Sequence, residues 1–227
     1  MNRIAILPAK LYSRRIKNKN ITKFFGKHII EYTIINLIKS KLFKKIHIST
    51  DSQIIAKIAK KYNIKIDFFR TKELCEDHVG LNDVIKHVLE RYMSTGKYYD
   101  TVCLAYATAP LLEHKDFILA CKKFEKTELK YPLLSIGKYR PSIDMAMKIS
   151  NDIIAPLNNK LFFQDTKKNK DLMFDTGSFM FFTPNHLFKK RKSSKYHYYK
   201  LPFEKSIDID NLDDLEVAKK LFILKKK

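Results

Sequence analysis

Short apolar runs alternate along the chain with longer stretches in which apolar residues recur at helical spacing. The short runs are bounded by polar or turn-forming residues, as is typical of buried strands. The longer stretches place apolar residues three or four positions apart, which predicts amphipathic helices. The predicted strands are residues 4–7, 46–49, 64–69, 101–105, 132–136, 180–183 and 196–201. The predicted helices are residues 29–38, 54–62, 84–92, 114–127 and 212–222.

This alternation of strands and helices predicts an α/β fold. Crossover connections of this length build a mostly parallel sheet with helices on both faces, which is a three-layer sandwich. A length of 227 residues suits a single domain that spans residues 1–227. The alternation breaks over residues 139–175, which are mixed, polar and without helical period. We expect this stretch to leave the sheet as a small excursion that serves as a dimerisation arm or a lid.

Composition narrows the classes of protein that the chain can belong to. No apolar run approaches the roughly 20 residues that a membrane-spanning helix needs. The first apolar run ends at Pro8, too early for a signal peptide. The three cysteines are widely spaced and contain no Cys-x-x-Cys pair, which indicates reduced thiols. These features predict a soluble, cytoplasmic protein with no membrane partner.

Positive charge is concentrated in the first part of the chain. The formal net charge is +21, and residues 1–50 hold 12 Lys and Arg against one acid, Glu31. A basic cluster over residues 10–19 directly follows the first strand, and in parallel sheets ligands bind at the carboxyl ends of strands. We therefore expect a polyanionic ligand there, either a nucleotide triphosphate or a nucleic acid. Lysines elsewhere reflect a chain that is rich in Lys throughout. Neither a Gly-x-Gly-x-x-Gly nor a Gly-x-x-x-x-Gly-Lys motif occurs.

An acidic segment near the end of the chain contrasts with this basic background. In Ser206-Ile-Asp-Ile-Asp210, two isoleucines alternate with Asp208 and Asp210, so an extended backbone projects both carboxylates from one face. Two like charges that close repel each other unless a cation neutralises them, and a hard divalent ion does so with oxygen ligands. The alternative is a strand end followed by a helix N-cap at Asn211, with both carboxylates solvated.

Several ordered motifs resemble the acylneuraminate cytidylyltransferase family over essentially the whole chain. The first loop matches the family's I-P-A-R-G-G-S-K opening and its later K-N-I. Residues 48–51 match its Ser-Thr-Asp motif. Arg70 with Glu73-Leu74 matches the family's Arg before a Glu-Leu, and Asp77-His78 matches its Asp-His pair. The remaining matches are residues 106–111, 175–179 and 206–210. The resemblance implies a Rossmann-like fold of the nucleotide-diphospho-sugar-transferase type and a homodimer. It also implies transfer of CMP from CTP to a nine-carbon keto sugar acid, with release of pyrophosphate.

The resemblance also implies roles for the matching positions. The family's triphosphate-binding positions correspond to Lys10, Ser13, Arg14, Lys19 and Asn20. Arg70 corresponds to a position near the cytidine, and Asp208 and Asp210 to ligands of Mg²⁺. The sugar pocket would be lined by Tyr106, Thr108, Gln164 and Asp175, and the residues with catalytic roles would be Lys10, Lys19 and Asp210.

Details of the motifs favour one branch of the family and also depart from it. Tyr106-Ala-Thr-Ala-Pro110 is similar to the pseudaminic acid branch, with sialic acid and legionaminic acid activation as near alternatives. Leu11-Tyr12 replaces a glycine pair whose backbone freedom lets N–H groups approach phosphate, so either this loop has an ordinary backbone or the site is impaired. Lys10 stands for an arginine, keeping the charge without the bidentate fork. Phe162 stands where the branch often has an arginine.

Two readings of other classes stay open at this point. The basic first segment is compatible with a nucleic-acid-binding α/β domain, but a nucleic-acid partner leaves the paired aspartates unexplained. A family member that binds nucleotide without catalysis is compatible with the departures in the first loop.

Overall fold

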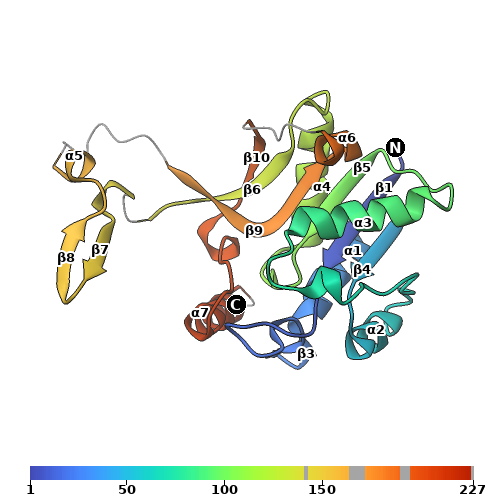
Figure 1. Ribbon diagram of the computed structural model, residues 1–227, viewed down its shortest axis with the longest axis horizontal. Helices are drawn as coiled ribbons and strands as arrows, with labels where there is room; N and C mark the ends of the chain where they lie inside the picture. Colours follow the sequence, from blue (N-terminus) through green and yellow to red (C-terminus); the bar gives the residue numbers. More distant parts are fainter. Residues whose placement is uncertain (141–142, 164–171, 190–194, 226–227) are drawn as a thin grey trace.

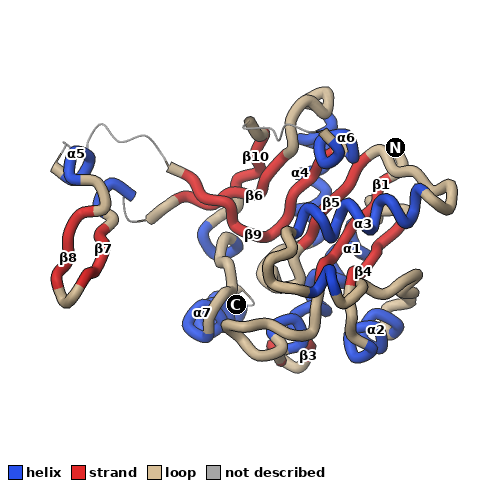
Figure 2. The backbone as a smooth tube through the Cα atoms, viewed as in Figure 1, coloured by secondary structure: helices blue, strands red, loops and turns tan. Residues whose placement is uncertain are grey.

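The computed structural model describes residues 1–140, 143–163, 172–189 and 195–225 and shows a layered α/β fold (Figures 1 and 2). The sheet strands are β1 (Arg3–Pro8), β4 (Lys45–Ser49), β5 (Thr101–Ala105), β6 (Leu133–Lys138), β9 (Met173–Phe182) and β10 (His197–Lys200). The longer helices are α1 (Ile29–Ser40), α2 (Gln53–Lys60), α3 (Leu81–Met93), α4 (His114–Glu125) and α7 (Leu212–Leu224). Shorter elements are η1 (Lys19–Ile21), β2 (Lys23–Phe24), β3 (Lys27–His28), η2 (Glu73–Cys75), η3 (Ile143–Met145), α6 (Pro184–Phe188) and η5 (Phe203–Lys205). Among the described residues, no helix has the length and apolar character needed to span a membrane.

The strands form one sheet in the order β10-β6-β9-β5-β1-β4. The pairs β1–β4, β1–β5 and β6–β10 are parallel, while β9 runs antiparallel between β5 and β6. The predicted mostly parallel sheet is therefore confirmed. The sequence analysis predicted a strand only at residues 180–183, so it missed the larger part of the antiparallel strand β9.

Side chains of β1 alternate between two hydrophobic clusters, one on each face of the sheet. Ala5 and Leu7 pack among residues of α1, α2 and α4, whereas Ile4 and Ile6 pack against α3. All four side chains are fully buried. This two-sided burial explains why β1 appears in the sequence as a continuous apolar run.

The predicted strand at residues 64–69 is wrong. This segment forms no ladder with the described strands, and its backbone joins the sheet edge through Arg70 N–H, which donates to Thr50 O at 2.8 Å. Ile64 and Ile66 pack into the hydrophobic cluster on the face of the sheet that α1, α2 and α4 cover. Phe68 packs on the other face of the sheet, with α3. An extended segment that buries alternate side chains has the same periodicity as a strand, so the pattern did not distinguish them.

The predicted excursion leaves the sheet between β6 and β9 (Figure 1). It contains a hairpin of β7 (Met147–Ser150) and β8 (Ile153–Pro156), followed by α5 (Asn159–Phe162). These elements extend well away from the sheet in Figures 1 and 2. The excursion ends slightly earlier than residue 175, because β9 begins at Met173.

Candidate active site

The carboxyl ends of β1, β4 and β5 meet at one edge of the sheet, as parallel strands require. A cavity of about 260 Å³ opens there. Seven of the predicted site residues line it: Lys10, Ser13, Lys19, Asn20, Arg70, Tyr106 and Thr108. Hollows of about 420 Å³ occur elsewhere, one of them beside α3 and α6, but none of the predicted site residues lines it. The cavity at the sheet edge is therefore the candidate active site, because it gathers cationic and polar side chains from three separate loops.

Two of the predicted triphosphate-binding cations share one carboxylate. Lys10 Nζ lies 2.8 Å from Asp77 Oδ1, and the Arg14 guanidinium lies 2.5 Å from Asp77 Oδ2. The hydrogen bond from Lys10 and the nearby charge of Arg14 lower the pKa of Asp77. Lys10 also donates to the carbonyl oxygen of Cys75 at 3.1 Å, and Asn20 Nδ2 donates to Lys10 O at 2.8 Å. Asp77 belongs to a matched motif, but the sequence indicated no role for it.

The first loop has an ordinary backbone where the family's glycine pair is replaced. Neither Leu11 nor Tyr12 has a positive φ, so neither residue needs the conformational freedom of glycine. Leu11 N–H donates to Asp51 Oδ1 at 3.0 Å, which ties this loop to the loop after β4. The structure therefore shows the ordinary loop backbone that the sequence left open as one of two possibilities. Tyr12 is 64% exposed and does not line the cavity.

Arg70 is held rigidly at the wall of the cavity. Its side chain is buried and donates from Nε to Ser49 Oγ at 3.1 Å and from a terminal nitrogen to Ser49 O at 2.8 Å. Burial lowers the pKa of Arg70, while Asp51 and the Cys75 thiol oppose the shift. The guanidinium remains a cation, since an arginine in a protein does not lose its proton. A buried cation with a fixed orientation is well suited to nucleotide recognition.

The acidic segment faces the same edge of the sheet. Ile209 is fully buried in a cluster with Phe24 and Ile29, and the alternation directs Asp208 and Asp210 the other way. Lys19 Nζ donates to Asp210 Oδ1 at 3.2 Å. The Arg15 guanidinium lies 2.6 Å from Asp210 Oδ2. The sequence placed Arg15 in the basic cluster without a role, because only the folded loop brings it to Asp210.

The two aspartates differ in protonation behaviour. Desolvation, followed by the charge of Asp210, raises the pKa of Asp208 to about 6. Hydrogen bonds and charge from Lys19 and Arg15 outweigh desolvation at Asp210 and lower its pKa. A cation bound beside the two carboxylates would favour the ionised form of both, including the one that resists ionisation.

The predicted sugar-binding residues fall into two groups. Tyr106 and Thr108 line the cavity, and burial with the nearby charges of Asp175 and Asp208 raises the pKa of Tyr106 to about 12. Asp175 lies in β9, where its Oδ1 accepts a hydrogen bond from Gly177 N–H at 3.0 Å. Gly177 has φ +57°, which strains other residues, and a Cβ there would lie 3.0 Å from Asp208 Oδ2, so a side chain at this position would press on that carboxylate.

Two further positions were named in the sequence analysis. Gln164 lies outside the described residues. Phe162 ends α5 in the excursion, far from the sheet edge in Figure 1. The departure from arginine at this position therefore leaves the cavity formed by the chain itself unchanged.

A model of the cytidylyltransferase family matches residues 4–226. The chain belongs to the cytidylyltransferase family. It is 33% identical over 231 residues to pseudaminic acid cytidylyltransferase of Campylobacter jejuni, covering 98% of this chain and 97% of that protein. It is 29% identical to N-acylneuraminate cytidylyltransferase of Escherichia coli, covering 95% of this chain and 51% of that protein. The resemblance seen in the motifs is thus confirmed, and the cytidylyltransferase is an enzyme of the nucleotidyltransferase class.

Solved structures confirm the fold of this cytidylyltransferase. The structure of CMP:2-keto-3-deoxy-manno-octonic acid synthetase complexed with CTP superimposes with a TM-score of 0.73 at 11% identity. The superposition covers 99% of this chain and 100% of the synthetase chain. A 4-diphosphocytidyl-2C-methyl-D-erythritol synthase of Anaerococcus prevotii gives a TM-score of 0.64 at 13% identity, covering 97% and 98% of the two chains. At these identities the likeness concerns the architecture alone.

Proposed function

We propose that this cytidylyltransferase activates pseudaminic acid, a nine-carbon keto sugar acid, with CTP. The anomeric hydroxyl of the sugar attacks the α-phosphate, a new O–P bond forms, and pyrophosphate leaves. The pseudaminic acid branch is supported by the relative from Campylobacter jejuni, which matches over nearly the full length of both chains. The observation that carries the proposal is the convergence of Lys10, Lys19, Arg70 and Tyr106 on one cavity. Sialic acid and legionaminic acid remain the alternative substrates.

Positioning and charge neutralisation dominate phosphoryl-type transfer, and the cationic residues supply both. In the proposed complex, Lys10, Ser13, Arg14, Lys19 and Asn20 hold the triphosphate. Arg70 holds the cytidine end, since its guanidinium is fixed by Ser49 at the cavity wall. Tyr106, Thr108, Asp175 and Gln164 are proposed to contact the sugar. Lys19 and Lys10 stabilise the charge that develops on the phosphate oxygens.

The acidic segment fits a divalent cation that is shared with the substrate. No cluster of three or more His, Cys, Asp or Glu side chains that could hold a metal occurs among the described residues. Mg²⁺ is usually bound through one or two carboxylates together with substrate phosphates. Asp208 and Asp210 supply those carboxylates, and burial together with the charge of Asp210 raises the pKa of Asp208, so a bound cation would favour its ionised form. When bound, Mg²⁺ would neutralise phosphate oxygens and favour the attacking oxyanion.

The test is pyrophosphate release from the purified protein with CTP and Mg²⁺. Pseudaminic, legionaminic and N-acetylneuraminic acids are offered in parallel, with and without a chelator. Turnover with pseudaminic acid alone, lost without metal, is the expected result. Preference for another sugar would correct the substrate. If the protein binds CTP but releases no pyrophosphate with any of the three sugars, it would be a family member that binds nucleotide without catalysis.

A nucleic-acid-binding role is less well supported by the geometry. The cations of the first loop are engaged by carboxylates: Lys10 and Arg14 by Asp77, and Arg15 and Lys19 by Asp210. Lys10 and Lys19 also line the cavity, where a small anionic ligand fits better than a duplex. We propose that the enzyme acts in the cytoplasm, where CTP is available.

The hairpin of the excursion supports the expected homodimer. Ile149 and Ile154 are directly opposite in the β7–β8 register, and Met147 shares their face. These side chains are 79%, 61% and 46% exposed, respectively. A two-stranded hairpin with an uncovered apolar face gains stability by packing on another surface. We propose that a second copy of the chain covers it.

A further inference from the structure

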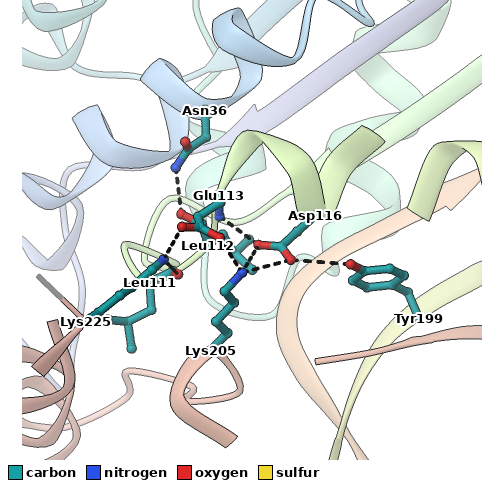
Figure 3. Close-up of polar contacts among 8 residues, drawn as sticks. All are labelled: Asn36, Leu111, Leu112, Glu113, Asp116, Tyr199, Lys205 and Lys225. Carbon is teal, nitrogen blue, oxygen red and sulfur yellow. Dashed lines mark hydrogen bonds and ion pairs between the residues drawn. The ribbon is translucent and has the colours of Figure 1, made fainter. Parts of the chain in front are cut away.

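A cluster of charged side chains joins the segment before the aspartates to the start of α4 (Figure 3). Lys205 Nζ lies 2.7 Å from Glu113 Oε2 and 2.9 Å and 3.1 Å from the two oxygens of Asp116. Three acceptors match the three N–H bonds of the ammonium group. The Lys205 side chain is 13% exposed and that of Asp116 is 6% exposed. An ion pair with this degree of burial holds its partners in a defined geometry.

The carboxylates of this cluster are themselves fixed in place. Glu113 caps α4, and its own N–H donates to Asp116 Oδ2 at 2.8 Å. Tyr199 Oη reaches Asp116 Oδ1 at 3.4 Å from β10. The loop before α4 is the one that carries Tyr106 and Thr108, so the cluster is continuous with the cavity wall. The anchor on α4 is therefore rigid and belongs to the same scaffold as the candidate active site.

The segment that Lys205 anchors carries the proposed metal ligands. Asp208 lies three residues after Lys205, and Asp210 lies five residues after Lys205. Between them, Ser206 is buried and Ile209 is fully buried, which leaves the segment little freedom to rotate. The attachment of Lys205 to α4 therefore holds this segment at a fixed place beside the cavity wall.

We propose that Lys205 is a positioning residue that fixes the place of the segment carrying Asp208 and Asp210, and so presents both carboxylates to the divalent cation. This inference rests on the metal role in the proposed function. Residues that orient the ligands of a metal typically change its affinity by about 10- to 100-fold when removed. Lys205 touches neither aspartate, so its effect passes through the backbone of residues 206–210.

Lys225 provides a matched comparison at the far end of α7. Its ammonium lies 3.0 Å from the other oxygen of Glu113 and donates to Leu111 O at 3.1 Å. Lys225 therefore uses the same carboxylate as Lys205 (Figure 3), but α7 separates it from Asp210 in the chain. Lys225→Met removes an ion pair of the same kind without loosening the segment that carries the aspartates.

The experiment measures Mn²⁺ binding by electron paramagnetic resonance of the free ion, in the presence of CTP and without sugar. We expect Lys205→Met to raise the dissociation constant for Mn²⁺ by about tenfold and to raise the Mg²⁺ requirement for turnover in parallel. At saturating Mg²⁺, kcat should fall by less than about threefold, because the ligands themselves are intact. Lys225→Met should leave the Mn²⁺ dissociation constant unchanged, even if it lowers Tm.

A second variant guards against misfolding, because Lys205→Met leaves the buried Asp116 carboxylate unpaired. The double variant Lys205→Met/Asp116→Asn removes the anchor and that charge together, and it should show the same loss of Mn²⁺ affinity. Equal Mn²⁺ affinity in wild type and in the double variant would overturn the positioning role alone. Equal shifts in the Lys205 and Lys225 variants would also overturn it. Absence of Mn²⁺ binding by the wild type would overturn the proposed metal role as well.

Discussion

The Lys19 ammonium lies 3.2 Å from Asp210 Oδ1, and the two residues are 191 positions apart in the chain. The same ammonium donates to the carbonyl oxygen of Ile209 at 2.9 Å. This pair closes the candidate active site, because it joins the basic loop after β1 to the acidic segment before α7. It also separates the two aspartates chemically, since Lys19 holds Asp210 ionised while Asp208 takes up a proton more readily.

Asp210→Asn should reduce kcat/KM for CMP-sugar formation by at least about 100-fold, because the metal would lose a charged ligand. Pyrophosphate release over a range of Mg²⁺ concentrations provides the measurement. Asp213→Asn is the matched control, since Asp213 lies exposed in the first turn of α7. Nearly full activity of Asp210→Asn would show that Asp210 is not a metal ligand.

Asp51→Ala should weaken CTP binding, because Leu11 N–H loses its acceptor and the first loop is released from the loop after β4. One hydrogen bond of this kind is worth about 1 kcal/mol, which corresponds to roughly a fivefold increase in KM for CTP. Asp51→Asn retains an acceptor oxygen and should be close to wild type. Steady-state kinetics with CTP as the varied substrate distinguishes them, and an unchanged KM in Asp51→Ala would contradict the role given to this bond.

His47 should make the folded state sensitive to acid. Burial lowers the pKa of His47 to about 3, and its Nδ1 lies 2.9 Å from Tyr92 Oη. The ring is neutral in the folded protein, whereas the unfolded chain binds a proton below about pH 6.5. The unfolded state therefore binds more protons between about pH 6.5 and 3, and stability falls as pH falls through that window.

The variant His47→Gln keeps a donor near Tyr92 and removes the titration. The difference in the free energy of unfolding between pH 7 and pH 5 should be smaller in this variant by about 2 kcal/mol. Urea unfolding of both proteins at the two pH values provides the measurement. Identical pH dependence in both proteins would show that His47 becomes protonated without unfolding.

Ile149→Glu with Ile154→Glu should convert the expected dimer to monomers, because the change places two charges on the apolar face of the hairpin. Lys148→Glu is the control, since Lys148 lies on the opposite face of β7. Light scattering after size-exclusion chromatography measures the mass directly. A wild-type monomer at micromolar concentration would show that the hairpin has another purpose.

The alternation of apolar runs and helical periodicity predicted most elements of the sheet and its flanking helices. It failed at residues 64–69, where packing of Ile64 and Ile66 produces a strand-like pattern without a ladder. It also missed the first part of β9, because Thr176 and Ser178 are buried polar residues that interrupt the apolar pattern. Thr176 Oγ1 donates to Ser135 O at 3.1 Å, so hydrogen bonds with β6 replace apolar burial there.

Ordered motifs located most of the candidate site before any fold was known. Lys10, Ser13, Lys19, Asn20 and Arg70 were predicted from the sequence and line one cavity, although their individual roles remain predictions. Arg15, Asp51 and Asp77 were missed as contributors to the site. Each acts on a residue distant in the sequence or across a loop, and such a contact has no periodic signal.

The sequence by itself determined the strand–helix alternation, the basic loop after the first strand and the paired aspartates near the end. These features are local, because they depend on side-chain periodicity and on the chemistry of neighbouring residues. The tertiary structure decided which charges meet: Lys19 with Asp210, Lys10 with Asp77, and Lys205 with Asp116. It also decided that Leu11 and Tyr12 fit the loop without positive φ. Such relationships depend on strand order and on the direction of each side chain, and both emerge only when the sheet is assembled.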